Sequence, residues 1–146
     1  MTTCSSFWLF HIPSERFSRF AGRESSSPKD GLFPRSRFRC ISAVWHNDAI
    51  ILMVDAGQIR LANLQTETIQ TLELTMPFGY ITAIILKENV IYMLDIGNTC
   101  IWHYDLEEET LHKRVYENIQ GLGIKNNELW ICSTPPSGEH LLQRLR

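Results

Sequence analysis

The sequence predicts an all-β fold built from tandem repeats, and three observations lead to this prediction. The stretch Ile41–Asp55 is repeated, without a gap, as Ile81–Asp95 and a third time as Ile119–Ser133. Within each copy, short apolar runs of strand length alternate with polar triplets that favour tight turns. The copies recur at intervals of 40 and 38 residues, and self-similarity at such a period indicates a repeat architecture.

Each copy opens with two strands joined by a turn. In the first copy we expect strands over Ile41–Trp45 and Ala49–Val54, with the triplet 46–48 between them. Asn and Asp in such triplets tolerate the left-handed backbone conformation that a hairpin turn requires. The second strand is an unbroken apolar run, which suits a strand covered on both faces. The same pair of strands is expected at Ile81–Ile85 and Val90–Leu94, and at Ile119–Ile124 and Leu129–Cys132.

The repeat continues into a third and a fourth strand. Segment 59–69 matches segment 101–111, and each contains a polar, acidic turn after its first half. Fourth strands are expected over Thr68–Leu74 and Thr110–Tyr116. Four antiparallel strands in a repeat of this length form one blade of a β-propeller. The predicted copies span residues 40–78, 79–117 and 118–146, and the third stops before a fourth strand.

The stretch that follows the second strand carries a family resemblance. Residues Asp95–Asp105 resemble the Asp-x-Gly-Asn-x-x-Ile-x-x-aromatic-Asp core of NHL repeats, and Asp55–Ile59 is a weaker version of it. Cys100 stands where NHL repeats usually carry Arg, and residues 133–136 replace Asp-x-Gly-Asn in the third copy. The Gly-His and Trp-Asp dipeptides of WD40 blades are absent. Over residues 40–146 the resemblance implies NHL-like or WD-type propeller blades.

Length sets the next expectation. Propellers typically close with about four to eight blades, whereas residues 40–146 supply two full copies and most of a third. A blade cannot bury both faces of its sheet alone. We therefore expect an incomplete β-propeller, which is either a fragment or short isoform of a larger propeller or a piece completed by self-association. An open meander that is stable alone remains an alternative.

The first 39 residues have a different composition. They carry seven Arg or Lys against three acids, a net charge of +4, whereas residues 40–146 carry seven against thirteen, a net charge of −6. Ser and Pro interrupt any regular periodicity, so residues 1–39 are predicted to be a disordered tail. Two alternatives stay open: a mitochondrial transit peptide, and an interaction arm whose Arg and aromatic residues dock an acidic surface or stack on single-stranded nucleic acid.

Compartment and membrane association follow from what the sequence does not contain. No apolar run is long enough for a secretory signal core or a transmembrane span. The four cysteines show no metal-ligand spacing, so we expect reduced thiols and no zinc site. These observations predict a cytoplasmic or nuclear protein with no membrane contact, with mitochondria as the weaker expectation.

The chain carries no recognisable catalytic motif, and no cofactor is expected. It lacks a nucleophile elbow and a Gly-rich phosphate loop. Asp55 and Asp95 occupy the same place in two copies and are expected to cap turns; in the alternative they hold a metal, as in lactonase-like propellers. A metal site made by His103, His112 and Asp105 is disfavoured. The acidic blades would repel phosphate, so nucleic acid is not expected on them.

The sequence thus predicts a non-enzymatic protein–protein interaction module, or scaffold fragment, with no catalytic residues and no metal site. Blades of this kind display loop residues rigidly, and a few anchors supply most of the affinity. The predicted partner contacts are Arg60, Trp102 and Glu107, of which Trp102 is expected at the surface. Two rivals remain: a metal-dependent propeller hydrolase, and a truncated isoform with little activity of its own.

Overall fold

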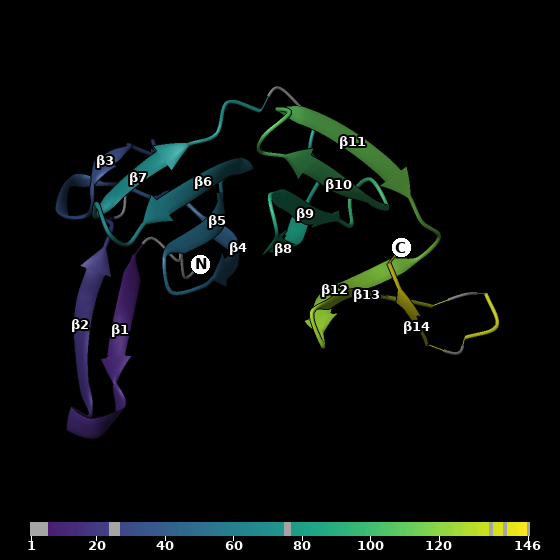
Figure 1. The fold of residues 1–146 in the computed structure, drawn as a ribbon, viewed down its shortest axis with the longest axis horizontal. Coiled ribbons are helices and arrows are strands. Elements are labelled where there is room, and N and C mark those ends of the chain that lie inside the picture. Colours follow the sequence, from purple (N-terminus) through teal and green to yellow (C-terminus); the bar gives the residue numbers. More distant parts are fainter. Residues whose placement is uncertain (1–5, 24–26, 75–76, 135, 139, 146) are drawn as a thin grey trace. The chain divides into compact units, whose positions relative to one another are not determined.

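The computed structural model describes residues 6–23, 27–74, 77–134, 136–138 and 140–145. The chain divides into two compact units, Met1–Thr75 and Met76–Arg146. Within the described residues the secondary structure consists of antiparallel strands and two 3₁₀ turns, η1 (Ile12–Ser14) and η2 (Phe33–Arg35) (Figure 1). No helix in that part of the chain has the length and apolar character needed to cross a membrane.

The first unit contains one five-stranded sheet and a separate two-stranded hairpin. The sheet has the order β3-β7-β6-β5-β4, and the hairpin pairs β1 with β2 and projects away from it (Figure 1). Four of the sheet strands follow the predicted repeat in sequence order, and β3 adds a fifth at the β7 edge. The strands are β1 (Phe7–His11), β2 (Arg16–Ala21), β3 (Gly31–Leu32), β4 (Ile41–His46), β5 (Ile50–Asp55), β6 (Gln58–Asn63) and β7 (Thr68–Thr71).

The second unit contains two sheets. The first has the order β11-β10-β9-β8, and the second has the order β12-β13-β14 among the described residues. Both are simple antiparallel meanders, so the four-strand copy and the shorter third copy are confirmed. The strands are β8 (Ile81–Lys87), β9 (Val90–Asp95), β10 (Cys100–Asp105), β11 (Thr110–Val115), β12 (Ile119–Lys125), β13 (Glu128–Ser133) and β14 (Leu141–Arg144).

The three copies share the same strand register. The first residue of each copy pairs with the last residue of its second strand, and the pairing then shifts at a bulge two residues further on. The pairs are Ile41–Asp55, Ile81–Asp95 and Ile119–Ser133. Since a bulge is a local, specific feature of a strand pair, its presence in all three copies shows that the sequence repeat is a structural repeat.

Side-chain oxygens cap three of the predicted polar turns. Asn47 Oδ1 accepts the backbone N–H groups of Ala49 and Ile50, each at 2.8 Å. Asn63 and Asp105 cap the outer turns of the first two copies in the same way, each accepting two N–H groups. These bonds satisfy turn amides that cannot join the sheet ladder, which is why Asn and Asp recur at these places.

The N-terminal segment belongs in part to the core of the first unit, so the prediction of a disordered tail over residues 1–39 is too broad. Phe33 and Phe38 are 3% and 0% exposed and pack with Met53, Ala62 and Ile69 on one face of the sheet. Without this cover the apolar face would meet water. The tail residues 1–5 and 24–26 lie outside the described residues.

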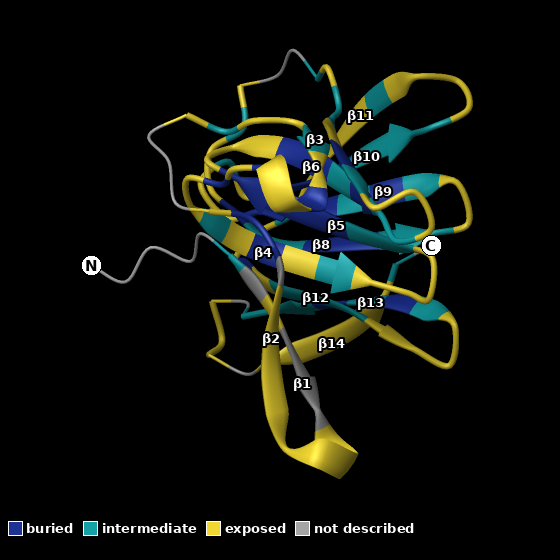
Figure 2. Cartoon of the chain, turned by 90° about the vertical axis from the view of Figure 1, so that its left-hand side faces the viewer, coloured by how far each residue is buried: buried dark blue, intermediate teal, exposed yellow. Residues whose placement is uncertain are grey.

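In the second unit the two sheets pack face against face. Leu94 and Ile101 of the four-stranded sheet form one buried cluster with Ile119 and Ile131 of the three-stranded sheet. Strands β8 and β12, the first of each copy, also lie in contact. Figure 2 shows buried residues on β8 and β9 and shows β14 as exposed. This packing is the blade-on-blade burial that the repeat requires.

Candidate functional site

The candidate site lies where the second strand of each copy ends. We call this the strand-end position; it is occupied by Asp55, Asp95 and Ser133. The third strand of each copy carries what we call the donor position. This position pairs with the residue two places before the strand-end position, and it is occupied by Arg60, Trp102 and Gln143. These two positions face the same side of the sheet, because side chains alternate with period two.

In the first copy, a carboxylate and a guanidinium form a buried ion pair. Asp55 and Arg60 are both 0% exposed, and Arg60 Nη1 lies 2.7 Å from Asp55 Oδ2. The other oxygen, Asp55 Oδ1, accepts the backbone N–H groups of Arg39 at 2.9 Å and Cys40 at 2.8 Å. Asp55 therefore ties the start of the copy to the end of its second strand.

Arg60 also holds the N-terminal segment. Its Nη2 donates to Asp30 Oδ1 at 2.9 Å and to the carbonyl of Lys29 at 2.8 Å, and its Nη1 donates to the carbonyl of Arg37 at 2.6 Å. The guanidinium lies over the ring of Phe38, 4.9 Å from its centroid. Asp30 in turn accepts the N–H and hydroxyl of Thr71 on β7. This network places β3 beside β7.

In the second copy the same carboxylate is held by neutral donors. Asp95 accepts the backbone N–H groups of Gly79 at 2.8 Å and Tyr80 at 2.9 Å, and the indole Nε1–H of Trp102 at 3.0 Å. The backbone N–H and side-chain amide of Asn98 donate two more bonds. Burial by itself raises the pKa of Asp95, but these hydrogen bonds outweigh it and lower the pKa to about 2.

The second copy needs glycine beside this carboxylate. A Cβ on Gly79 would lie 2.7 Å from Asp95 Oδ1, and a Cβ on Gly97 would lie 2.9 Å from the backbone nitrogen of Tyr80. Both distances are shorter than atoms tolerate. The Asp-x-Gly pattern found in the sequence therefore marks a close approach of the backbone around an ionised carboxylate.

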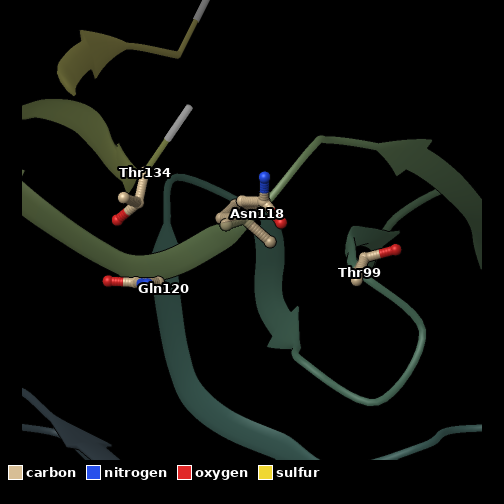
Figure 3. A pocket seen from close by; sticks show the side chains of 5 residues that line it. Thr99, Asn118, Gln120 and Thr134 are labelled. Carbon is tan, nitrogen blue, oxygen red and sulfur yellow. The ribbon is translucent and has the colours of Figure 1, made fainter. Parts of the chain in front are cut away.

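The third copy keeps the backbone and loses the carboxylate. A polar groove of about 410 Å³ opens next to it, lined by Thr99, Asn118, Ile119, Gln120 and Thr134. Figure 3 shows the side chains of Asn118, Gln120 and Thr134 around this groove, with Thr99 on the loop between β9 and β10. The hydroxyl of Thr134 lies 2.9 Å from Nδ1 of His140.

Two of the three predicted contact residues are not at the surface. Arg60 is 0% exposed and Trp102 is 4% exposed, so the expectation that Trp102 is a surface residue is wrong. The physical reason is that each side chain donates a hydrogen bond to a buried carboxylate. No pattern in the sequence predicts these two bonds. Glu107 is exposed and its carboxylate accepts a 3.3 Å bond from Asn89. Its role in binding stays a prediction.

The structure places His103 and His112 directly opposite each other on β10 and β11, as the strand assignment implied. The ring of His103 packs against Tyr92, and burial lowers the pKa of His103, with Arg114 and His112 adding to the effect. Among the described residues, no group of three His, Cys, Asp or Glu side chains is arranged to hold a metal ion.

Sequence reasoning missed two participants. Asp30 lies in the segment assigned to the tail, and nothing in its local sequence signals a bond to Arg60. Gln143 lies in the third copy, whose sequence shows no recognisable counterpart of Arg60 or Trp102. The signal that could have found the donor position is its place in the repeat: Arg60 and Trp102 both follow an isoleucine that matches between copies, Ile59 and Ile101.

Comparison with solved structures identifies the architecture. Virginiamycin B lyase from Staphylococcus aureus superposes with a TM-score of 0.51 and 13% identity over 72% of this chain and 41% of that chain. A streptogramin B lyase structure gives 0.51 and 12% over 72% and 40%. The computationally designed Ika8 protein gives 0.50 and 14% over 78% and 40%. These are β-propeller-like proteins. The fold is an incomplete β-propeller.

The likeness extends to the fold alone, because the identities are low. The incomplete propeller spans about two fifths of the length of each of these structures. No protein-family model matches the chain, and no curated protein matches it by sequence. The propeller-type blade is thus established from geometry, while the family of the repeat is not.

Proposed function

We propose that this chain is a non-enzymatic protein-interaction module in which propeller blades carry an aromatic and basic hairpin that docks a partner. The supporting observation is the hairpin formed by β1 and β2. On it, Trp8, Phe17 and Ile12 are 58%, 71% and 77% exposed. Large exposed apolar side chains gathered on one element mark interaction surfaces. Trp and Arg are also the residue types that dominate binding hot spots.

The chemistry of the hairpin favours an acidic protein surface as the partner. Trp8 pairs across the strands with Arg19, and Phe17 lies two residues before Arg19 on the same face of β2, so an arginine shares this face with both aromatic rings. Residues 6–23 hold three arginines against one glutamate. A lone two-stranded hairpin is marginally stable in water, so a covering partner would stabilise it. Glu107 remains a secondary candidate contact on the outer turn of the second copy.

The hydrolase alternative receives no support from the aspartates. The carboxylate oxygens of Asp55 and Asp95 are occupied by three and five hydrogen bonds, which suits a structural role. A thermal-shift titration with Ca²⁺ and with Zn²⁺ separates the two functions. The interaction module predicts no change in melting temperature, and a saturable rise would favour the hydrolase.

We also infer that the copies are NHL-type repeats. The support is the Asp95-x-Gly97-Asn98 stretch, because each named residue has a defined task there. Asp95 accepts the bonds described above, Gly97 permits the close approach, and the Asn98 side chain donates to Asp95 at 2.8 Å and to the carbonyl of Pro77 at 3.0 Å.

The interaction proposal is tested on the full chain with a photo-crosslinking amino acid at position 17. Partners captured in cells are identified, and the purified partner is then titrated against the wild type and against a Trp8→Ala/Phe17→Ala variant. We expect at least a tenfold loss of affinity, since two exposed aromatic anchors are removed. Val115→Ala is the matched control, because Val115 is 65% exposed on edge strand β11. Equal binding by all three proteins would refute the proposal.

A further inference from the structure

The third copy has the same backbone at the strand-end position as the first two. The N–H of Thr134 donates to the carbonyl of Asn118 at 3.1 Å. The equivalent bonds run from Ala56 to Cys40 at 2.8 Å and from Ile96 to Tyr80 at 3.0 Å. Ser133 pairs with Ile119 in the register in which Asp55 and Asp95 pair with their own partners. At the strand-end position itself, Ser133 replaces the carboxylate.

The groups that receive the carboxylate in the other copies have counterparts here. Asp55 and Asp95 each bind the two backbone N–H groups that immediately precede the first strand of their copy. In the third copy those two residues are Glu117 and Asn118. At the donor position, Gln143 lies opposite Ile131, as Arg60 lies opposite Met53 and Trp102 opposite Met93. Its side-chain amide is a hydrogen-bond donor.

A cavity lies beside Ser133, the residue at the strand-end position of the third copy. It has a volume of about 210 Å³ and is lined by Tyr116, Glu117, Ile131, Ser133, Leu141 and Gln143. We call it the Ser133 cavity. Both the strand-end position and the donor position of the third copy are among its walls. A space of this size accepts several waters or a small organic acid, since one water takes about 30 Å³ in the liquid.

A buried donor in this wall lacks a partner. The hydroxyl oxygen of Tyr116 is inaccessible to water and makes no hydrogen bond with the described residues. A buried polar group without a partner is costly, and such groups are uncommon in native proteins. Burial raises the pKa of Tyr116, so its hydroxyl stays protonated. The hydroxyl of Ser133 is a donor in the cavity wall.

We propose that the Ser133 cavity binds a carboxylate group supplied from outside the fold, which takes the place that the aspartate side chain has in the other two copies. The candidate donors are the two backbone N–H groups before β12, the hydroxyl of Ser133 and the side-chain amide of Gln143, and a carboxylate accepts four or more hydrogen bonds. The apolar walls, Ile131 and Leu141, suit a short aliphatic tail behind the carboxylate.

One feature of the wall opposes the ligand charge. Glu117 lines the cavity, and its side chain is exposed to solvent, so water screens the repulsion without removing it. This carboxylate sets the affinity expected for a simple acid well below that of a dedicated anion site. It also predicts that binding tightens in Glu117→Gln.

The test uses acetate and propionate as probes, titrated into the ¹⁵N-labelled full chain with chloride as the ionic control. We expect saturable shifts of the Glu117 and Asn118 amide signals with the two acids, and none with chloride. Ser133→Asp supplies the carboxylate from the chain itself. In this variant the two amide signals should sit at shifted positions without acetate, and acetate should move them no further.

Two further variants keep the test decisive. Ser137→Asp adds the same charge at an exposed position outside the cavity wall, and acetate should bind it as it binds the wild type. Gln143→Leu removes one side-chain donor without adding charge, and the dissociation constant should rise about tenfold, the loss expected for one hydrogen bond to a charged group. This variant carries the test if Ser133→Asp does not fold.

The origin of the carboxylate is separated by a pair of peptides that end in a free or an amidated C-terminus. Tighter binding of the free-carboxylate peptide than of acetate assigns the cavity to a protein terminus. Binding of acetate and propionate without the peptide assigns it to small acids. The proposal is overturned if no probe gives saturable shifts, or if acetate shifts the amides of Ser133→Asp as strongly as those of the wild type.

Discussion

The first and second copies each hold a buried carboxylate, but they do so with different hydrogen-bond donors. Both bury an aspartate at the end of the second strand, and both bind it to two backbone N–H groups from the start of the copy. The first copy completes the carboxylate with Arg60, whose charge then needs a second acid, Asp30. The second copy uses Trp102 and Asn98, which are neutral and need no further partner.

This difference explains why the N-terminal segment is attached to the first copy. Arg60 has more donors than Asp55 can accept, and the surplus N–H groups bind Asp30 and the carbonyls of Lys29 and Arg37. A tryptophan at the same place donates one bond and leaves nothing for a fifth strand. The charged donor Arg60 therefore binds the N-terminal segment as well as Asp55, whereas the neutral donor Trp102 bonds only within its own copy.

The largest effect should come from removing the buried acid of the first copy. Asp55→Ala leaves the buried guanidinium of Arg60 with two backbone carbonyls and the half-exposed carboxylate of Asp30. We expect a loss of about 3–5 kcal/mol in the free energy of unfolding, the usual cost of breaking a buried pair on one side. Denaturant unfolding followed by circular dichroism measures it. Asp48→Ala, at an exposed turn acid, is the control, and equal losses in the two variants would contradict the network.

An intermediate loss of stability is expected when low pH protonates Asp95 in the second copy. The pKa of Asp95 is about 2 in the folded chain and near its ordinary value of 3.8 when unfolded. Its contribution of about 2 kcal/mol is therefore complete above pH 4 and is lost as the pH falls from about 4 to about 2. Stability measured across this window should fall less steeply in Asp95→Asn than in the wild type. Glu108→Gln, an exposed acid, should keep the wild-type slope.

The smallest effect should come from the second acid of the first copy. Asp30 is 44% exposed, so its pair with Arg60 is screened by water. Asp30→Asn keeps one acceptor oxygen and should lower the free energy of unfolding by about 1 kcal/mol. Hydrogen exchange should accelerate at the Thr71 amide, because this amide donates to Asp30. The Arg39 and Cys40 amides donate to Asp55 and should stay protected. Equally accelerated exchange at all three amides would show that Asp30 and Asp55 do not hold their amides independently.

Sequence reasoning recovered the repeat because the repeat is local. The apolar runs, the Asn and Asp turns and the copy register are each set by neighbours within about 40 residues, and the strands formed where those patterns predicted them. Strand β7 begins at the predicted Thr68 and ends at Thr71, three residues before the predicted Leu74. The NHL-like resemblance named the Asp-x-Gly-Asn stretch without saying what the aspartate binds.

The long-range contacts escaped the sequence. An arginine on a strand is usually exposed, and the burial of Arg60 depends on Asp55 and on Asp30, which lies 30 residues earlier. Phe33 and Phe38 carry no periodic pattern, because Pro, Arg and Ser separate them in a largely polar segment. They are core residues because one face of the first sheet needed cover.

The amino-acid sequence alone determined that this chain is a set of antiparallel strand copies in a common register. The reason is that the apolar runs and the polar turns between them act on near neighbours in the chain. Only the tertiary structure decided which donor completes each buried carboxylate, which segment covers the first sheet, and that the third copy holds a cavity beside Ser133. Those outcomes depend on groups far apart in the chain meeting away from water, where an unpaired charge or donor is too costly to leave alone.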